Sequence, residues 1–522
     1  MRTRAILGRR TEGDEWTEPE LRRLERARLA RDPRFDGTFF IAVVTTGIYC
    51  RPVCPATPPK PENVRYYRSA AGAAAAGFRP CLRCRPEASP GTPAWLGTSA
   101  TVSRALRLID EGALDEDRGE RDDGRRPTEG LANRLGLGER HLRRLFDRHL
   151  GASPAAVART RRVHFARRLL EETPLKIADV AFASGFGSLR AFNEAFRAAY
   201  GVAPRQVRTR RSGAGPAPAF TFRLGYRPPG DWPGLLGYLE PRTMPGVETV
   251  EDGAYRRLIR WQGSAAVLEV APAPGGKGGA LQTLELRLHA ARPGEPPSAN
   301  RLLELVTRVR RMFDLGADPD VVARTLRADP LLAARVRRFP GVRLPVAWDP
   351  FELAVRAILG QQVSVAAATT LAGRLVERFG EPVPSSDGGV ASDALHTLFP
   401  TPARLAEEDL AVIGLPRARA EALRGLARAV ADGVPVLDAG KPLDELIGGL
   451  CELPGIGPWT AHYVALRGLG VPDAFPAGDL GLRRALRRDS GSLPSAADVA
   501  SRAEAWRPWR GYGALLLWRE AA

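Results

Sequence analysis

The sequence is poor in cysteine, and it has neither a long apolar run nor a signal-peptide-like beginning. Five cysteines among 522 residues are too few for a disulfide-stabilised scaffold. No stretch of about 18 uninterrupted apolar residues occurs, which excludes a transmembrane helix. The first 15 residues lack an apolar segment of signal-peptide length, so we expect a cytoplasmic protein. A hydrophobic content of 44% excludes bulk disorder, and at roughly 150 residues per domain the length allows three or four domains.

Acidic residues are scarce relative to basic ones, mainly in the N-terminal half. The formal net charge is +18, of which residues 1–216 carry +15 and residues 217–522 only +3. Such an asymmetry indicates an N-terminal half that binds nucleic acid. Only four of the 77 basic residues are lysine. This arginine bias is typical of a GC-rich genome and says little about function.

Changes in composition divide the chain. Residues 85–97 and 211–220 are rich in proline and glycine and read as linkers, and residues 110–127 read as an acidic, solvated loop. The apolar patterns predict a strand at 37–45, helices at 128–208, strands and turns at 219–290, and helices at 301–520. The predicted fold class is therefore multidomain and mainly α, with small α+β parts. We expect four domains, at residues 20–90, 98–210, 218–295 and 296–522.

Four of the five cysteines lie within the first hundred residues. Cys50 and Cys54 form a C-x3-C pair, and Cys81 and Cys84 form a C-x2-C pair 26 residues later. Two close pairs of thiolates fit a single tetrahedral Zn²⁺. The simplest role for such a zinc is structural, because metal binding can stabilise a domain too small to bury a sufficient core.

The segments TTGIYCRPVC (45–54) and GFRPCLRC (77–84) resemble the N-terminal domain of the Ada-type DNA repair proteins over about residues 25–90. The resemblance implies that Cys50 is both a zinc ligand and the irreversible acceptor of a methyl group from a DNA methylphosphotriester. Such a role agrees with general chemistry, since zinc keeps the sulfur a thiolate, which is the nucleophile. The resemblance also places Thr46, Arg79 and Arg83 at the DNA backbone. The chain departs from it at Thr57, where some relatives have arginine.

The methyl transfer would also change the charge of the metal centre. Zn²⁺ with four thiolates carries −2, and methylation of Cys50 leaves −1. One unit charge at about 8 Å in an effective dielectric of about 40 corresponds to about 1 kcal/mol per nearby phosphate. We therefore expect methylation to strengthen DNA binding, because it reduces repulsion between the centre and the phosphates.

Two segments predict helix-turn-helix units, LANRLGLGERHLRRLFDRHLG (131–151) and KIADVAFASGFGSLRAFNEAFRAAYG (176–201). Amphipathic helices of this kind usually serve core packing. However, residues 130–211 carry a net charge of +11, and the second segment resembles the AraC-type DNA-binding domain. The second helix of each unit would then face the major groove, where arginine can read guanine and asparagine can read adenine. The candidates for these contacts are Arg140, Arg143, Arg144, Ser188, Arg190 and Asn193.

A helix-hairpin-helix signature, LPGIGPWTAHYVALRG, occupies residues 453–468. Gly455 and Gly457 permit a tight hairpin whose backbone amides can meet a DNA phosphate. Asp479 follows Trp459 by 20 residues, near the start of a predicted helix. An N-terminal cap on a surface helix is the ordinary role of such an aspartate.

The hairpin and its surroundings resemble the AlkA-type 3-methyladenine DNA glycosylases over most of residues 218–520. The resemblance implies that Asp479 is the catalytic carboxylate, and that a monovalent cation accompanies the hairpin. It makes Trp459, Tyr463 and Trp518 the base pocket, and Gln361 and Gln362 part of a loop that enters the DNA. At the second of these positions some relatives have a leucine wedge. Core packing is the alternative role of the three aromatic residues.

The glycosylase chemistry can be argued from charge. A carboxylate can stabilise an oxocarbenium-like sugar and position water, and electron-rich aromatic rings favour a cationic, flipped-out base. Lyase activity is not expected, because Trp459 holds the place of the amine nucleophile and the last lysine is Lys441. The lone Cys451 is expected to be buried and structural. No Pro-Cys-His-Arg motif occurs, so reversal of O6-alkylguanine is not expected.

The combined prediction is a bacterial, nucleoid-associated fusion of methyl-acceptor sensor, transcription regulator and monofunctional glycosylase. We expect a monomer whose partners are alkylated DNA, promoter DNA and RNA polymerase. One alternative is a regulator whose glycosylase-like half is catalytically inactive and only binds DNA. Another is a glycosylase whose N-terminal half, with a structural zinc, merely tethers it to DNA.

Overall fold

The structure is a computed structural model that describes residues 16–90, 100–115, 127–208, 219–274, 282–292, 295, 297–383, 394–487 and 491–521. The first 15 residues and most of the two expected linkers and the acidic loop lie outside these ranges. Within the described residues, no helix combines the length and apolarity needed to cross a bilayer.

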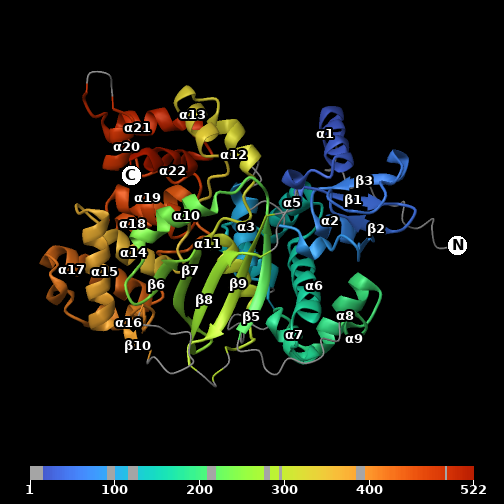
Figure 1. Cartoon of the computed structure of the whole chain (residues 1–522), viewed down its shortest axis with the longest axis horizontal. Helices are drawn as coiled ribbons and strands as arrows, with labels where there is room; N and C mark the ends of the chain where they lie inside the picture. The colour runs from blue at the N-terminus through green and yellow to red at the C-terminus, as the bar shows by residue number, and fades with distance from the viewer. Residues whose placement is uncertain are drawn as a thin grey trace.

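A small sheet domain comes first. It contains α1 (Glu18–Leu29), β1 (Phe40–Val43), β2 (Ile48–Cys50), β3 (Val64–Tyr67), α2 (Ala70–Ala75) and β4 (Arg79–Pro80). The strand order is β3-β1-β2-β4, and β2 pairs with β4 in parallel, with Tyr49 opposite Pro80. This register sets Cys50, at the end of β2, beside Cys81, which directly follows β4. In Figure 1 this domain is blue and lies beside α6.

The described residues that follow form the helices α3 (Ala100–Asp110), α4 (Pro127–Arg134), α5 (Glu139–Leu150), α6 (Pro154–Glu172), α7 (Ile177–Ala183), α8 (Leu189–Tyr200) and α9 (Pro204–Val207). The two expected helix-turn-helix pairs are α4–α5 and α7–α8. Both second helices end at a left-handed glycine, Gly151 at φ 66° and Gly201 at φ 73°. A side chain there would be strained, so these glycines stop the helices where the chain turns.

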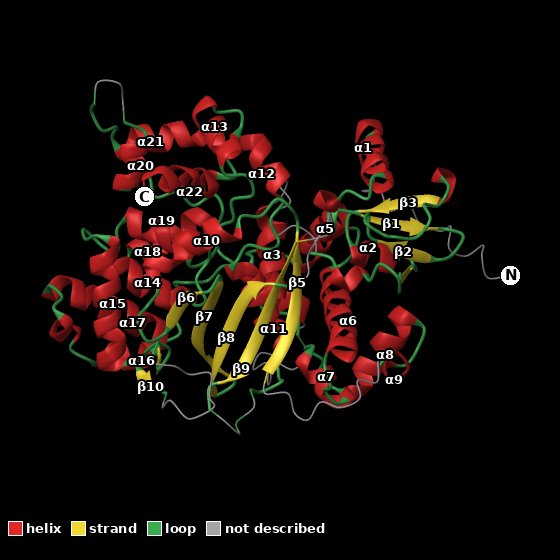
Figure 2. Cartoon of the chain, in the orientation of Figure 1, coloured by secondary structure: helices red, strands yellow, loops and turns green. Residues whose placement is uncertain are grey.

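The next part is an antiparallel sheet of β5 (Ala219–Tyr226), β6 (Glu248–Glu251), β7 (Ala254–Trp261), β8 (Ser264–Pro272) and β9 (Gln282–Ala290), with α10 (Trp232–Leu239) between β5 and β6. The strand order is β5-β9-β8-β7-β6. In Figure 2 the sheet lies at the centre, between the N-terminal helices and the C-terminal helical domain.

The C-terminal part is almost entirely helical, as predicted. Its helices are α11 (Leu302–Met312), α12 (Pro319–Leu326), α13 (Pro330–Arg338), α14 (Pro350–Leu359), α15 (Val365–Phe379), α16 (Pro402–Glu407), α17 (Arg417–Ala431), α18 (Leu443–Cys451), α19 (Pro458–Arg467), α20 (Leu480–Ala485), α21 (Ala496–Ala503) and α22 (Arg510–Ala521). Helices α12 to α22 contribute to one apolar core, whereas the buried face of α11 belongs to the apolar cluster of the central sheet. The two-residue strands β10 (Glu381–Pro382) and β11 (Thr397–Leu398) also lie in this part of the chain. The predicted fold class is confirmed.

Helix α6 contacts both the zinc-ligand domain and the central sheet. On one side, His164 hydrogen-bonds with the Tyr49 hydroxyl at 2.8 Å, next to Cys50. On the other, Phe165 packs against Phe222 of β5 with ring centroids 6.0 Å apart. A single apolar cluster therefore runs from α6, α7 and α8 into the sheet. The chain pattern does not show this shared core, since its two sides are separated by the linker at 211–220.

The shared core predicts that the two halves unfold together. The contact between α6 and β5, where Phe165 meets Phe222, is the joint between the two halves. Phe222→Ala is expected to reduce the free energy of unfolding by about 3–5 kcal/mol, because this fully buried ring fills the joint. Promoter binding and base release, each measured after brief heating, should then be lost at the same lowered temperature. Leu405→Ala, within the separate helical-domain core, is the control and should affect base release more than promoter binding. If Phe222→Ala lowers only one activity, the joint does not couple the halves.

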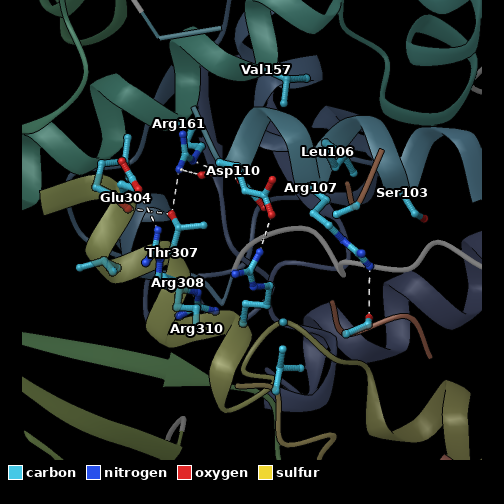
Figure 3. A pocket seen from close by; sticks show the side chains of 18 of the residues that line it. Ser103, Leu106, Arg107, Asp110, Val157, Arg161, Glu304, Thr307, Arg308 and Arg310 are labelled. Atoms are coloured by element: carbon cyan, nitrogen blue, oxygen red, sulfur yellow. Dashed lines mark hydrogen bonds and ion pairs between the residues drawn. The ribbon is translucent and has the colours of Figure 1, made fainter. Parts of the chain in front are cut away.

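A cavity of about 890 Å³ lies on the other side of this joint, between α3, α6, α11 and the helical domain. Figure 3 shows arginine side chains from these helices directed into it. Arg161 donates to Thr307 at 2.8 Å and Arg107 to the Gly470 carbonyl at 3.1 Å, so polar contacts bridge the halves here. Burial lowers the pKa of Arg310, which lies among other arginines, to about 9.

Candidate metal centre, DNA-binding helices and base pocket

The four N-terminal cysteines form one cluster. Their sulfur atoms all lie within 4.8 Å of one another, as ligands of a single metal ion must. Four soft sulfur donors at this spacing fit tetrahedral Zn²⁺. Cys81 and Cys84 are buried, whereas Cys50 and Cys54 are partly exposed. The pair at 50 and 54 is thus the accessible side of the centre.

Arg51, which the sequence analysis did not single out, supports the cluster from within. Its backbone N–H donates to the Cys84 sulfur at 3.4 Å, and its guanidinium donates to the Cys84 carbonyl at 3.0 Å. The guanidinium also pairs with the fully buried Asp36, at 2.8 Å from Nε to Oδ1. Burial lowers the pKa of Arg51, but the Asp36 carboxylate outweighs it and the pKa is raised. In the sequence, Arg51 could have been identified as a supporting residue because its charge directly follows the metal ligand Cys50.

Asp36 also links the zinc-ligand domain to the rest of the chain. Its carbonyl accepts from Nε of Arg227, a fully buried residue after β5, at 2.8 Å. Arg227 in turn donates to the Gly316 carbonyl at 2.8 Å. The cluster is therefore held in a framework that extends into the C-terminal half.

The three side chains expected at the DNA backbone near the cluster are all exposed. Thr46 lies in the β1–β2 turn, Arg79 at the start of β4 and Arg83 between the two buried cysteines. A guanidinium nitrogen of Arg79 lies 3.4 Å from where a side chain would begin at Gly201, the end of α8. Arg79 therefore lies beside the second helix-turn-helix unit. Thr57 is exposed as well.

The second helices of both units present charged faces. On α5, Arg140, Arg143 and Arg144 are exposed, while Leu142 and Phe146 are buried on the opposite face.

On α8, Arg190 is 89% exposed and pairs with Glu194 at 3.1 Å, a residue that the sequence analysis did not consider. The Asn193 amide donates to the Leu189 carbonyl at 2.8 Å. Ser188 is the N-cap of α8, because its hydroxyl accepts from the Ala191 N–H at 3.2 Å, so this hydroxyl already has a structural role.

The hairpin connects α18 to α19. Gly455 has φ 81°, and a side chain there would approach the Ala422 Cβ to 2.5 Å, so this position needs glycine. Gly457 caps α19 and has open space around it, which leaves its backbone accessible. Cys451, the last residue of α18, is exposed, so the expectation that it is buried was wrong. It lies on the outer face of a short helix whose inner face carries Leu446 and Leu450.

Asp479 takes part in two sets of hydrogen bonds, one within its own helix and one with two of the residues expected to form the base pocket. It is the N-cap of α20 and accepts from the Leu482 N–H at 3.0 Å. Its carboxylate also accepts from two indole N–H groups, that of Trp459 at 3.0 Å and that of Trp518 at 2.8 Å. Three donors therefore fix the orientation of the carboxylate.

The same residues line a cavity of about 430 Å³. Trp459 and Tyr463 are nearly parallel, with centroids 5.4 Å apart, and Trp518 meets Tyr463 edge-on at 6.2 Å. The structure thus brings the three expected aromatic residues together around Asp479. All three are only partly buried, as expected for the walls of a cavity.

The cavity also has a basic side, which no motif in the sequence indicates. The Arg467 guanidinium lies 4.6 Å from the ring centroid of Tyr238, and that of Arg242 lies 4.0 Å from the same ring. Arg467 also lies 5.9 Å from the Tyr463 ring. The rings of Tyr238 and Tyr463 therefore already have arginines beside them.

The two glutamines of the loop between α14 and α15 have different surroundings. Gln361 donates to the Gly455 carbonyl at 2.9 Å and to the Thr460 hydroxyl at 3.0 Å, which ties the loop to the hairpin. Gln362 is exposed and has φ 58°, a strained conformation for this residue. The neighbouring Val363 and Ser364 line the base cavity, so Gln362 lies near its mouth.

The fold and these sites define a helix-hairpin-helix DNA glycosylase joined to a zinc-binding and helix-turn-helix half. Comparison with known families gives the same order of parts. The metal binding domain of Ada matches residues 23–87, a helix-turn-helix domain 131–210, the AlkA N-terminal domain 221–349, and the HhH-GPD superfamily of base excision DNA repair proteins 355–511.

Relatives of known name cover almost the whole chain. The probable bifunctional transcriptional activator/DNA repair enzyme AlkA of Mycobacterium tuberculosis is 42% identical over 504 residues, which are 96% of each chain. DNA-3-methyladenine glycosylase 2 of Escherichia coli is 37% identical over 57% of this chain and 96% of its own. The Escherichia coli bifunctional transcriptional activator/DNA repair enzyme Ada is 40% identical over 27% of this chain and 36% of its own. The chain belongs to the family of bifunctional transcriptional activator/DNA repair enzymes of the AlkA type.

Proposed function

We propose that this protein repairs alkylated DNA and regulates the response to alkylation. Its C-terminal half excises alkylated bases such as 3-methyladenine by hydrolysis, and its N-terminal half takes a methyl group from a DNA methylphosphotriester. The observation that supports the glycosylase most directly is Asp479, held by two indole N–H groups at the edge of an aromatic cavity beside the hairpin.

Base excision follows from the placement of charge. The damaged nucleotide is flipped into the cavity, where Trp459 and Trp518 offer ring faces to an electron-poor base. As the glycosidic bond breaks, positive charge develops on the sugar, and the Asp479 carboxylate stabilises it. Asp479 also positions the water that completes hydrolysis. Trp459 stands where a lyase would need an amine, and Lys441 pairs with Glu445 at 3.9 Å before α18 begins, so the reaction leaves an abasic site.

Methyl transfer is assigned to the cysteine cluster. When bound, zinc keeps the four sulfurs deprotonated at neutral pH. The Cys50 thiolate attacks the methyl carbon, a C–S bond forms, the methyl–oxygen bond breaks, and the phosphotriester becomes an ordinary diester anion. The methylated sulfur is no longer a thiolate nucleophile, and the methyl group stays on it because a neutral thioether does not readily expel a thiolate, so the reaction occurs once. Partial exposure of Cys50, and the exposed Thr46, Arg79 and Arg83 on the same domain, support this assignment.

The remaining assignments concern DNA and other partners. Exposed side chains on α5 and α8 would read promoter DNA, and RNA polymerase would be the partner at that promoter. The hairpin amides at Gly455 and Gly457, with a monovalent cation, would bind a backbone phosphate, and Gln362 would fill the space of the flipped nucleotide. We further propose a monomer with the four domains 20–90, 98–210, 218–295 and 296–522.

One experiment separates this proposal from its alternatives. DNA carrying radiolabelled methyl groups is incubated with the protein, and protein-bound label and released bases are measured together. The proposal requires both. Label without released bases would indicate a regulator with an inactive glycosylase half, and released bases without label would indicate a glycosylase with a structural zinc.

Methylation of Cys50 should raise the affinity for promoter DNA, because the centre changes from −2 to −1. The gain should be largest at low salt and should shrink as salt rises, since it arises from weaker repulsion of phosphates. Titrations of methylated and unmethylated protein at several salt concentrations measure it. Equal affinities at low salt would contradict the charge mechanism and leave the DNA-binding assignment standing.

A further inference from the structure

The base cavity is electrostatically polarised along α19. Trp459, Tyr463 and Arg467 are spaced four residues apart and therefore follow one face of the helix, about 6 Å from one to the next. Trp459 is hydrogen-bonded to Asp479, whereas Arg467 is buried two turns further on. A base whose glycosidic bond lies at Asp479 must therefore point its far edge towards Tyr463 and Arg467.

The hydrogen bonds of Arg467 determine that the hydroxyl oxygens of Tyr238 and Tyr463 act as acceptors. Its Nη1 donates to the Tyr238 hydroxyl oxygen at 2.6 Å and to that of Tyr463 at 3.3 Å. A guanidinium can only donate, so both hydroxyl oxygens act as acceptors here. The protons of the two hydroxyl groups must consequently point elsewhere.

The two hydroxyl groups differ in their surroundings. Burial raises the pKa of Tyr238 to about 12. Burial also acts to raise the pKa of Tyr463, but Arg467 and Arg242 outweigh it and lower the pKa. The Tyr463 oxygen accepts from Arg467, and among the described residues no hydrogen bond donated by this hydroxyl is present, so its O–H is left as a donor at the cavity.

The carboxylates among the described residues of this cavity are engaged with other donors. Glu248 and Glu352 both accept from Arg257, at 3.0 and 2.7 Å. Asp479 accepts from the indoles and from its own helix. These carboxylates therefore do not take the Tyr463 proton, and an acceptor on the bound base can take it.

We propose that the Tyr463 hydroxyl, positioned by Arg467, is a specificity-determining donor that favours bases with an acceptor on the edge far from the sugar. Alkylated guanines present the O6 carbonyl oxygen there, whereas alkylated adenines present an amino group. An amino group would face the Tyr463 O–H donor-to-donor and leave both unpaired. The inference rests on the proposed base excision by this cavity. It predicts that the ratio of 3-methylguanine release to 3-methyladenine release is higher than the leaving-group abilities of the two bases alone would give.

The test uses one methylated duplex that carries both 3-methylguanine and 3-methyladenine, which share the alkylated position and the positive charge. Released bases are separated by chromatography, and the ratio of kcat/KM for guanine to that for adenine is compared between variants. Tyr463→Phe keeps the ring against Trp459 and removes the hydroxyl, and should lower this ratio about tenfold. Both bases come from the same protein sample, so partial loss of folded protein cancels in the ratio.

Tyr238→Phe is the matched control, since it removes the other hydroxyl bonded to Arg467 and leaves the Tyr463 donor in place. Its ratio should stay within about twofold of wild type. An unchanged ratio in Tyr463→Phe, or an equal fall in both variants, would overturn the inference while base release continues. If the wild-type protein releases neither base, the proposed function fails and the inference with it.

Discussion

Asp479→Asn should lower the rate of 3-methyladenine release by roughly two to three orders of magnitude. A single preorganised electrostatic group at a developing charge is typically worth about 2.7–4 kcal/mol. The asparagine oxygen can still accept from Leu482 and Trp518, so the helix cap persists. Its amide nitrogen, however, faces the Trp459 N–H, which becomes a donor without an acceptor. Single-turnover release from methylated DNA measures the loss, and binding to the same DNA should persist.

The chain offers a matched control for this variant. Asp329 is also an N-cap, on α13, and it also accepts from a tryptophan, Trp506 Nε1 at 2.8 Å. It does not line the base cavity. Asp329→Asn should disturb a cap and an indole bond in the same way and leave base release within a few-fold of wild type. Comparable losses in both variants would indicate that Asp479 matters for stability rather than for chemistry.

The state of the DNA after base release is a further expected result. Wild-type protein is expected to leave intact abasic sites that break only after alkali or heat. Borohydride should not trap the protein on DNA, because no lysine among the described residues lines the base cavity to form a Schiff base. If Asp479→Asn releases 3-methyladenine at the wild-type rate, the catalytic carboxylate lies elsewhere.

Local spacing was sufficient to find the parts of this protein that depend on short stretches of chain. The two cysteine pairs predicted one cluster, and their sulfurs meet within 4.8 Å. The resemblance of the hairpin region to the AlkA-type glycosylases implied a carboxylate at the base pocket 20 residues after Trp459, and Asp479 and Trp459 are hydrogen-bonded. In these cases the contact partners lie on adjacent elements, so the number of residues between them limits the geometry.

Contacts between distant segments were not visible in the same way. Tyr238 precedes Arg467 by 229 residues, yet the two share a hydrogen bond that shapes the base cavity. Arg227 and Asp36, 191 residues apart, link the metal-binding domain to the C-terminal half. Neither pair has a spacing that distinguishes it from an ordinary surface arginine or tyrosine. The buried position that gives each one its role is created only by packing.

Cys50→Ala is expected to abolish methyl uptake from phosphotriesters, because no other sulfur would then have its position at the end of β2. The variant keeps three sulfur ligands and should retain zinc more weakly. Cys84→Ala should lose zinc and with it the fold of this domain, since Cys84 is buried and its sulfur and carbonyl both accept from Arg51. Labelled methyl on the protein, zinc content and the mass of each cysteine peptide are the measurements.

The controls for this prediction lie in the same chain. Cys451→Ala removes the one cysteine outside the cluster, and because that residue is exposed on α18 it should leave methyl uptake and zinc content unchanged. Cys54 is the informative rival, since it is the other partly exposed member of the cluster. A methyl group found on Cys54 in the wild-type protein would contradict the assignment to Cys50, although the cluster would remain the acceptor. Uptake that survives in both Cys50→Ala and Cys54→Ala would place the acceptor outside the metal centre and leave its zinc with a structural role alone.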